Sequence, residues 1–168
     1  MRTSSDLFEQ LPVDKELVTK FFITFSRFEY ALKRGGYANG NENEVKANWD
    51  TLARDLREHF QPDRTDELRR AVDYIERHPP KKQIWKDHEL GWANNTRPPN
   101  GPQLLSLTCF IRTVRNNLFH GGKFLPSSVR DVSRDSTLLD SSLIILDECL
   151  RLCGEVKPDV HYHFFHFE

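Results

Sequence analysis

Residues 103–120 read QLLSLTCFIRTVRNNLFH, and this stretch decides the fold class. Its apolar residues recur every three or four positions, the spacing of one helix face, as Leu104, Leu107, Ile111, Val114 and Leu118. Pro102 suits a first helical turn, and Gly121-Gly122 supplies a C-terminal stop. The stretch therefore predicts a helix that begins near Pro102 and turns one face toward a hydrophobic core.

Helical spacing recurs in four other stretches of the chain. They run from Glu16 to Arg34, from Val45 to the residues before Gln61-Pro62, from Asp66 to Arg77, and from about Ser136 to Gly154. The last of these places Cys149 and Cys153 in its apolar stripe. Because no internal strand is convincing, the pattern predicts an all-α fold, an up-and-down bundle of about five helices.

Two stretches lie outside the predicted helices. Residues 79–102 are rich in proline and glycine, which predicts a long loop before the fourth helix, with a short turn around Trp85. Residues 158–168 form an aromatic and histidine-rich tail that alternates like a strand. Without a partner strand, this tail is interpreted as an ordered tail or an interface element. The whole chain, residues 1–168, is expected to form one domain.

Composition excludes several classes of protein. The chain has 168 residues, and 24 Lys and Arg against 25 Asp and Glu give a net charge of -1, too little to hold a long nucleic acid by charge alone. Three cysteines form no disulfide framework, which favours a reducing compartment. No apolar run of about 18 residues could span a bilayer. We therefore expect a cytoplasmic protein without a membrane partner.

One polar motif interrupts the apolar helix at residues 115–120. Arg115 and Asn116 are followed, after three intervening residues, by His120, and this pattern resembles the Arg-x4–6-His signature of the HEPN superfamily, in which a polar residue often follows the arginine. The segment RFEYALKR at residues 27–34 is also similar to the first helix of bacterial and plasmid-borne HEPN proteins. The resemblance covers most of the chain in element order, but only these two segments in residues.

The same spacing occurs a second time, in Arg54 and His59. There the arginine is followed by Asp, and the surrounding sequence RDLREHF is highly charged. That pair is interpreted as part of a solvated helix face. The pair Arg115 and His120 instead ends the most apolar helix and precedes Gly-Gly. It lies between the fourth and the last predicted helix, the placement that the HEPN family shows.

Helical geometry predicts a partner for Arg115. At about 100° per residue, Arg115 falls inside the apolar arc of its helix, and Glu29 falls inside the phenylalanine face of the first helix. Because an unpaired buried charge costs roughly several kcal/mol, a charge on an apolar face needs a partner of opposite sign. We therefore predict a contact between Glu29 and Arg115.

The resemblance implies a metal-independent endoribonuclease, a toxin or defence component, that cleaves single-stranded RNA as a homodimer without a cofactor. His120 would move the proton of the ribose 2′-OH, and Arg115 would bind the phosphate. Asn116 would orient His120 or the phosphate. Arg112 and Lys123 would add positive charge for the substrate, and Glu29 would support Arg115. An antitoxin or another protein is a further expected partner. The alternative function is a non-catalytic HEPN module that binds nucleotide, RNA or protein.

Arg115 and His120 are five residues apart, so they cannot converge on one atom while the helix stays regular. Either Gly121-Gly122 unwinds the last turn, or a second copy completes the site. A simpler interpretation of His120 is also open, because a histidine before a helix-ending glycine pair can cap the last carbonyls.

Two further groups have open interpretations. The first group lies in the long loop and consists of Lys81, Lys82, Trp85, Lys86, Trp92 and Arg97. It could stack on and clamp single-stranded RNA. Tryptophans in a long loop more often anchor that loop to the core. The second comprises His161, His163 and His166. Because no cysteine or carboxylate joins these histidines at ligand spacing, they predict a surface tail or dimer contact, and no metal site is expected.

Overall fold

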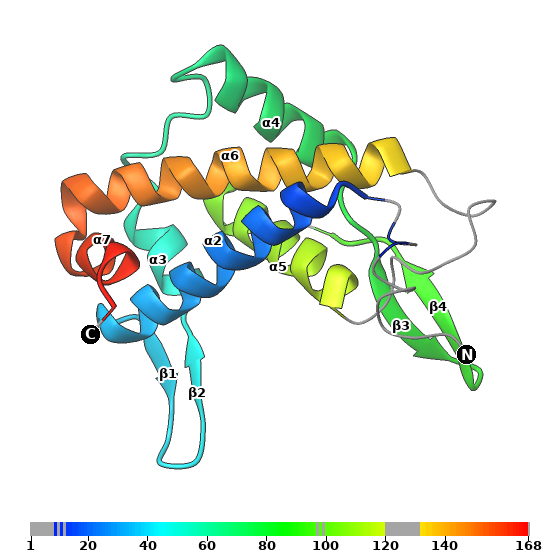
Figure 1. The fold of residues 1–168 in the computed structure, drawn as a ribbon, viewed down its shortest axis with the longest axis horizontal. Coiled ribbons are helices and arrows are strands. Elements are labelled where there is room, and N and C mark those ends of the chain that lie inside the picture. Colours follow the sequence, from blue (N-terminus) through cyan, green and yellow to red (C-terminus); the bar gives the residue numbers. More distant parts are fainter. Residues whose placement is uncertain are drawn as a thin grey trace.

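The structure, a computed structural model, describes residues 9, 11, 13–96, 98, 100–119 and 132–167. These residues form mostly α-helix together with two antiparallel hairpins (Figure 1). The helices are α2 (Lys15–Arg34), α3 (Trp49–Asp55), α4 (Asp66–Arg77), α5 (Gln103–Phe119), α6 (Val132–Val156) and α7 (Pro158–Phe165). The strands are β1 (Ala38–Gly40), β2 (Val45–Ala47), β3 (Lys82–Lys86) and β4 (Glu89–Ala93). The prediction of a mostly helical protein is confirmed, but the prediction of a purely all-α fold is wrong, because the two hairpins are β-structure.

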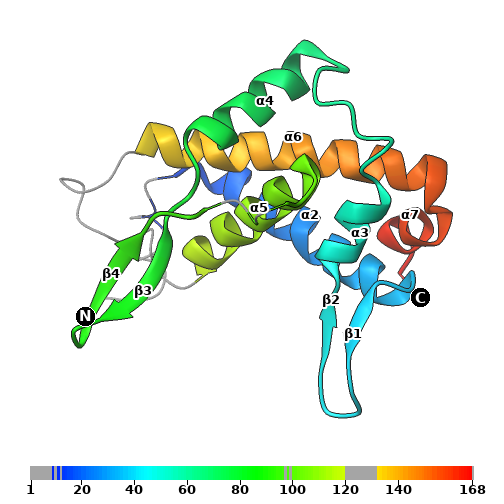
Figure 2. The same ribbon diagram turned by 180° about the vertical axis from the view of Figure 1, so that it is seen from behind.

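The hydrophobic core lies between the long helices. The predicted phenylalanine face of α2 buries Phe21, Phe25 and Phe28, and α5 buries the leucine face that was expected. Helix α6 runs along the molecule, with α4 packed on one side and α2 on another (Figures 1 and 2). Its Cys149 and Cys153 are buried as predicted, and burial raises the pKa of Cys153 to about 12. The helices predicted as first, fourth and last therefore supply much of the core.

Residues 38–47 form a hairpin, and its second strand takes the place of the predicted helix start at Val45. Val45 lies in β2 and is exposed, and the next helix, α3, begins only at Trp49. Asn48 caps that helix, because its side chain accepts a hydrogen bond from the Thr51 amide at 3.1 Å. The predicted start at Val45 was wrong because the asparagine cap, rather than the apolar spacing, determines where the helix begins.

Residues 79–102 are not the structureless loop that the prolines predicted. Strands β3 and β4 pair across a two-residue turn in which Asp87 and His88 both have positive φ, at 53° and 64°. Two such residues give the twist that a tight hairpin needs. The prolines precede β3 or follow β4, so they flank the hairpin instead of interrupting it.

The C-terminal tail is a helix, not a strand-like extension. Pro158 lies in the first turn of α7, where it costs no hydrogen bond. Val160 is buried and Phe164 packs against the core four residues later, on the same helical face. The alternation of histidine and aromatic residues resembled a strand because a short sequence can match both periods.

Among the described residues, no helix combines the length and the apolar character that crossing a bilayer requires.

Candidate functional site

Most of the described residues of the predicted site lie in the C-terminal half of α5. Arg112, Arg115 and Asn116 lie on this helix, and Glu29 lies on α2. His120 and Lys123 lie outside the described residues. Side chains of the two helices meet here, because the Phe22 ring of α2 lies 5.3 Å from the Phe119 ring of α5 between centroids.

The predicted contact between Glu29 and Arg115 is confirmed. Nη2 of Arg115 lies 3.8 Å from Oε2 of Glu29. Trp49 of α3 donates from Nε1 to Oε1 of the same carboxylate over 3.4 Å. The Trp49 ring packs against Phe25 and Phe28, so its position is set by the core. Glu29 is therefore held by three elements at once, α2, α3 and α5.

The Arg115 guanidinium is only partly enclosed. Its side chain is 36% exposed, and its Cζ lies 5.6 Å and 5.5 Å from the ring centroids of Phe25 and Phe119. Nη1 also donates to Oδ1 of the neighbouring Asn116 over 2.9 Å. A guanidinium placed against aromatic rings and one carboxylate keeps its charge and a fixed orientation. Such a group can bind an anion that approaches from the solvent side.

Arg112 is directed toward α3. Its Nη2 forms an ion pair with Oδ1 of Asp50 at 2.6 Å, and its Nε donates to the Thr108 carbonyl at 3.3 Å. The predicted role of Arg112 in binding substrate would require the Asp50 contact to be exchanged for a phosphate. In this structure Arg112 joins α3 to α5.

An apolar groove lies beside Arg115. It has a volume of about 330 Å³ and is lined by Leu11, Val18, Thr19, Phe22, Leu118 and Phe119. Phe22 and Phe119 stand 5.3 Å apart between ring centroids, and each is almost half exposed. Because Phe119 also contacts the Arg115 guanidinium, the groove and the polar site share one wall.

Two asparagines that the sequence did not single out fasten the β3–β4 hairpin to α5. Asn117 is buried and donates from Nδ2 to the Lys81 carbonyl at 2.8 Å. Asn95, also buried, donates to the Thr113 hydroxyl at 2.9 Å. The only signal for Asn117 was its place within the motif, and Asn95 had none. The hairpin therefore begins beside the residues of the predicted site.

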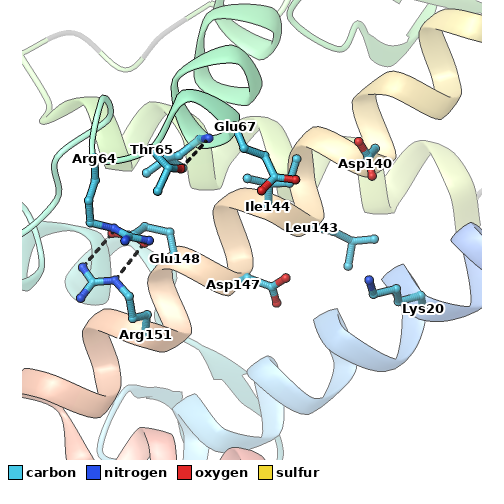
Figure 3. Close-up of a pocket in the computed structure, with 11 residues that line it drawn as sticks. Lys20, Arg64, Thr65, Glu67, Asp140, Leu143, Ile144, Asp147, Glu148 and Arg151 are labelled. Atoms are coloured by element: carbon cyan, nitrogen blue, oxygen red, sulfur yellow. Dashed lines mark hydrogen bonds and ion pairs between the residues drawn. The ribbon is translucent and has the colours of Figure 1, made fainter.

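A second hollow is lined by residues of α2, α4 and α6 (Figure 3). It measures about 290 Å³ and contains a buried carboxylate, Glu148, which accepts hydrogen bonds from Arg64 and Arg151. Burial raises the pKa of Glu148, but the hydrogen bonds from the two arginines outweigh it, so that this pKa lies below its ordinary value. The Glu148 charge is thus neutralised by its arginine partners, and we assign the cluster to stability.

In the described part of the chain, no three His, Cys, Asp or Glu side chains come together as a metal ion would require. His161, His163 and His166 lie on or just after α7. His166 stacks on Tyr162 at 4.0 Å, which is a contact within the same segment.

Comparison of the chain with protein-family models, with curated proteins and with solved structures gives no match.

Proposed function

We propose that the chain is a HEPN-type, metal-independent endoribonuclease that cleaves single-stranded RNA through the ribose 2′-OH. The observation that carries the proposal is the position of Arg115, which lies on the core side of α5 against Glu29 and still exposes 36% of its side chain. A partly enclosed arginine beside Asn116, five residues before a histidine, suits recognition of a phosphate.

The reaction requires the transfer of one proton in each direction. A neutral imidazole of His120 removes the proton from the 2′-OH, and the oxygen attacks the adjacent phosphorus. A second, protonated imidazole gives its proton to the departing 5′-oxygen. The bond from phosphorus to the 5′-oxygen breaks, and the products are a 2′,3′-cyclic phosphate and a 5′-hydroxyl. Arg115 stabilises the charge that develops on the phosphorane oxygens.

The need for two imidazoles supports a homodimer, because each chain has one His120. The apolar groove beside Arg115 is a surface that a second copy could cover, since Phe22 and Phe119 are almost half exposed there. A two-fold axis close to this groove would bring the two motifs to opposite sides of one phosphate. We therefore include dimerisation in the proposed active site.

One observation favours a second function, a non-catalytic module that binds nucleotide, RNA or a partner protein. Asn116 accepts a hydrogen bond from Arg115, and Arg112 is paired with Asp50. These contacts occupy polar groups that cleavage would use. A binding module needs Arg115 for an anion but has no need of His120, so a histidine variant separates the two functions.

The test is cleavage of single-stranded RNA by purified protein in EDTA, with the ends identified by mass spectrometry. We expect cyclic-phosphate ends and no cleavage of RNA that carries 2′-deoxy at the scissile nucleotide. His120→Ala should lower the rate by roughly 10²–10⁴-fold. Arg115→Ala should lower it by about 10²–10³-fold, the loss found when one stabilising donor is removed.

The chain offers matched controls with the same spacing. Arg54→Ala and His59→Ala change the other arginine and histidine that are five residues apart, and both residues are exposed. These variants should cleave at the wild-type rate. Equal cleavage by all variants would identify a contaminating nuclease and refute the proposal. RNA binding without cleavage, unaffected by His120→Ala, would establish the binding module instead.

A further inference from the structure

The β3–β4 hairpin exposes an aromatic side chain near its tip. Trp85 is 71% exposed, and its register partner Leu90 is 59% exposed. The interpretation of the loop tryptophans as anchors is therefore wrong for Trp85, whereas Trp92 is partly buried. Strand register places Trp85, Leu90 and Trp92 on one face of the ribbon. No other aromatic ring in the described part of the chain stacks on Trp85.

The same hairpin carries three lysines that have no ionic partner among the described residues. Lys81, Lys82 and Lys86 are exposed, and within the described residues none of them forms an ion pair. By contrast, Lys46 on the other hairpin is paired with Glu44 at 3.1 Å. Lys82 and Lys86 alternate with Trp85 along β3, so they lie on the opposite face of the ribbon. A chain that crosses the edge of β3 meets an aromatic ring on one face and, on the other, two lysines and one carboxylate, that of Glu89, the register partner of Lys86.

The position of the hairpin connects it to the candidate site. Asn117, two residues after Arg115, donates to the Lys81 carbonyl at 2.8 Å, and the hairpin lies near the C-terminal end of α5 (Figures 1 and 2). The tight turn at Asp87 and His88 makes the ribbon a short, defined arm. Its exposed groups are therefore preorganised on an arm that begins beside the motif.

We infer that the β3–β4 hairpin is the arm that binds single-stranded RNA next to the cleavage site, an inference that rests on the proposed function. A base stacks on the Trp85 ring, and phosphates on either side of that base contact Lys82 and Lys86. Stacking on an aromatic ring combined with positive charge is how proteins bind single strands without reading their sequence. A protein partner would leave the three lysines without a function.

The experiment measures binding of a fluorescein-labelled oligouridylate by fluorescence anisotropy. Every protein carries His120→Ala, so that the RNA stays intact and binding is measured apart from chemistry. Trp85→Ala should raise the Kd about tenfold, and Trp85→Phe, which keeps a ring, should raise it less. Val45→Ala, an exposed apolar residue on the other hairpin, is the matched control and should leave the Kd unchanged.

The lysines are tested by salt dependence, which a purely structural role would not alter. Each phosphate contact on a single strand contributes about 0.7 to the slope of log Kd against log salt concentration. Lys82→Gln with Lys86→Gln should therefore lower this slope by about 1.4. Lys46→Gln should not change it.

The outcomes separate this inference from the proposed function. RNA binding that is insensitive to both Trp85→Ala and the lysine changes would overturn the inference, and cleavage by the wild type would still support the function. Weaker binding by Trp85→Ala together with no cleavage by the wild type would refute the function and support the arm. If Trp85→Ala instead dissociates a dimer in sedimentation, with RNA affinity unchanged, the hairpin is an interface between copies and the inference is wrong.

Discussion

Glu148 is the least exposed charged residue that the structure describes, with 3% of its surface accessible. Its two oxygens accept hydrogen bonds from Arg64, which precedes α4, and from Arg151, one turn later on α6. Because Arg64 and Glu148 are 84 positions apart, this contact fastens the connection between α3 and α4 to the longest helix. The cost of burying one carboxylate is offset by two partly exposed guanidinium groups.

Replacing Glu148 should destabilise the fold. Glu148→Gln keeps the size of the side chain but removes the charge, and we expect it to lower the free energy of unfolding by about 2 kcal/mol, the value of hydrogen bonds to a charged group. Urea unfolding followed by circular dichroism measures the change. The control is Glu155→Gln, which removes the exposed partner of Arg151 and should cost at most about 0.5 kcal/mol. Equal losses in the two variants would contradict the assignment.

The lowered pKa of Glu148 predicts a loss of stability in acid. A carboxylate whose pKa is lower in the folded state stabilises the protein above its ordinary pKa, and this contribution disappears as the pH falls toward the folded value. The free energy of unfolding should therefore decrease as the pH is lowered through the ordinary pKa of 4.5 and below it.

Urea titrations from neutral to acidic pH measure this slope in the wild type and in Glu148→Gln, in which it should be smaller. Both proteins keep Asp147, whose pKa is raised by desolvation, so its opposite contribution cancels in the comparison. Parallel pH profiles for the two proteins would show that Glu148 does not titrate as we propose.

At the scale of elements, α7 depends on one side chain of α2. This helix has eight residues, too few to be stable alone in water. Arg27 donates to three carbonyl oxygens at its end, those of His163, Phe164 and His166, at distances between 2.6 and 3.0 Å. A guanidinium at a helix C-terminus satisfies free carbonyls and interacts favourably with the helix dipole.

Replacing Arg27 should release α7 before the rest of the fold. Arg27→Met keeps an unbranched apolar chain but donates no hydrogen bonds, and we expect a loss of about 2 kcal/mol. Hydrogen exchange should accelerate at the α7 amides while α5 keeps its protection. Arg70→Met, an exposed change on α4, is the control. Unchanged exchange in α7 would mean that its apolar contacts hold it without Arg27.

At the scale of the whole molecule, both hairpins project away from α4, on the side of the fold that also bears α2 and α5 (Figures 1 and 2). The C-terminal end of α5 thus contacts the base of the β3–β4 arm through Asn117. The same end of α5 lines the apolar groove through Phe119. We have assigned the arm to RNA and the groove to a second copy. These two surfaces leave Arg115 accessible between a substrate and a partner chain.

A charge placed in the groove should abolish dimerisation. Phe22→Glu puts a carboxylate where a second copy would bury it, and two-fold symmetry introduces the change twice. We expect the dimer Kd to rise at least about a hundredfold in sedimentation, with RNA cleavage falling in parallel. Val45→Glu, on the other hairpin, should affect neither quantity. A Phe22→Glu variant that cleaves RNA as a monomer would refute the composite site.

The sequence alone determined the helices whose apolar spacing is long and regular. The third predicted helix has the observed bounds, Asp66–Arg77, and α2 and α5 begin and end within a few residues of the prediction. It also determined the contact of Glu29 with Arg115. The reason is geometric, because a regular helix assigns each residue to a face, and a misplaced charge on an apolar face requires a partner opposite.

Only the tertiary structure decided the hairpins, α7 and the environment of Glu148. Short strands pair because a turn brings them together, and Asp87-His88 is not a typical turn sequence for a hairpin. The eight residues of α7 are helical because α2 supplies Arg27 and an apolar surface. Arg64 and Asn117 find their partners far away in the chain. These features depend on contacts between distant residues, which the local periodicity of a sequence does not encode.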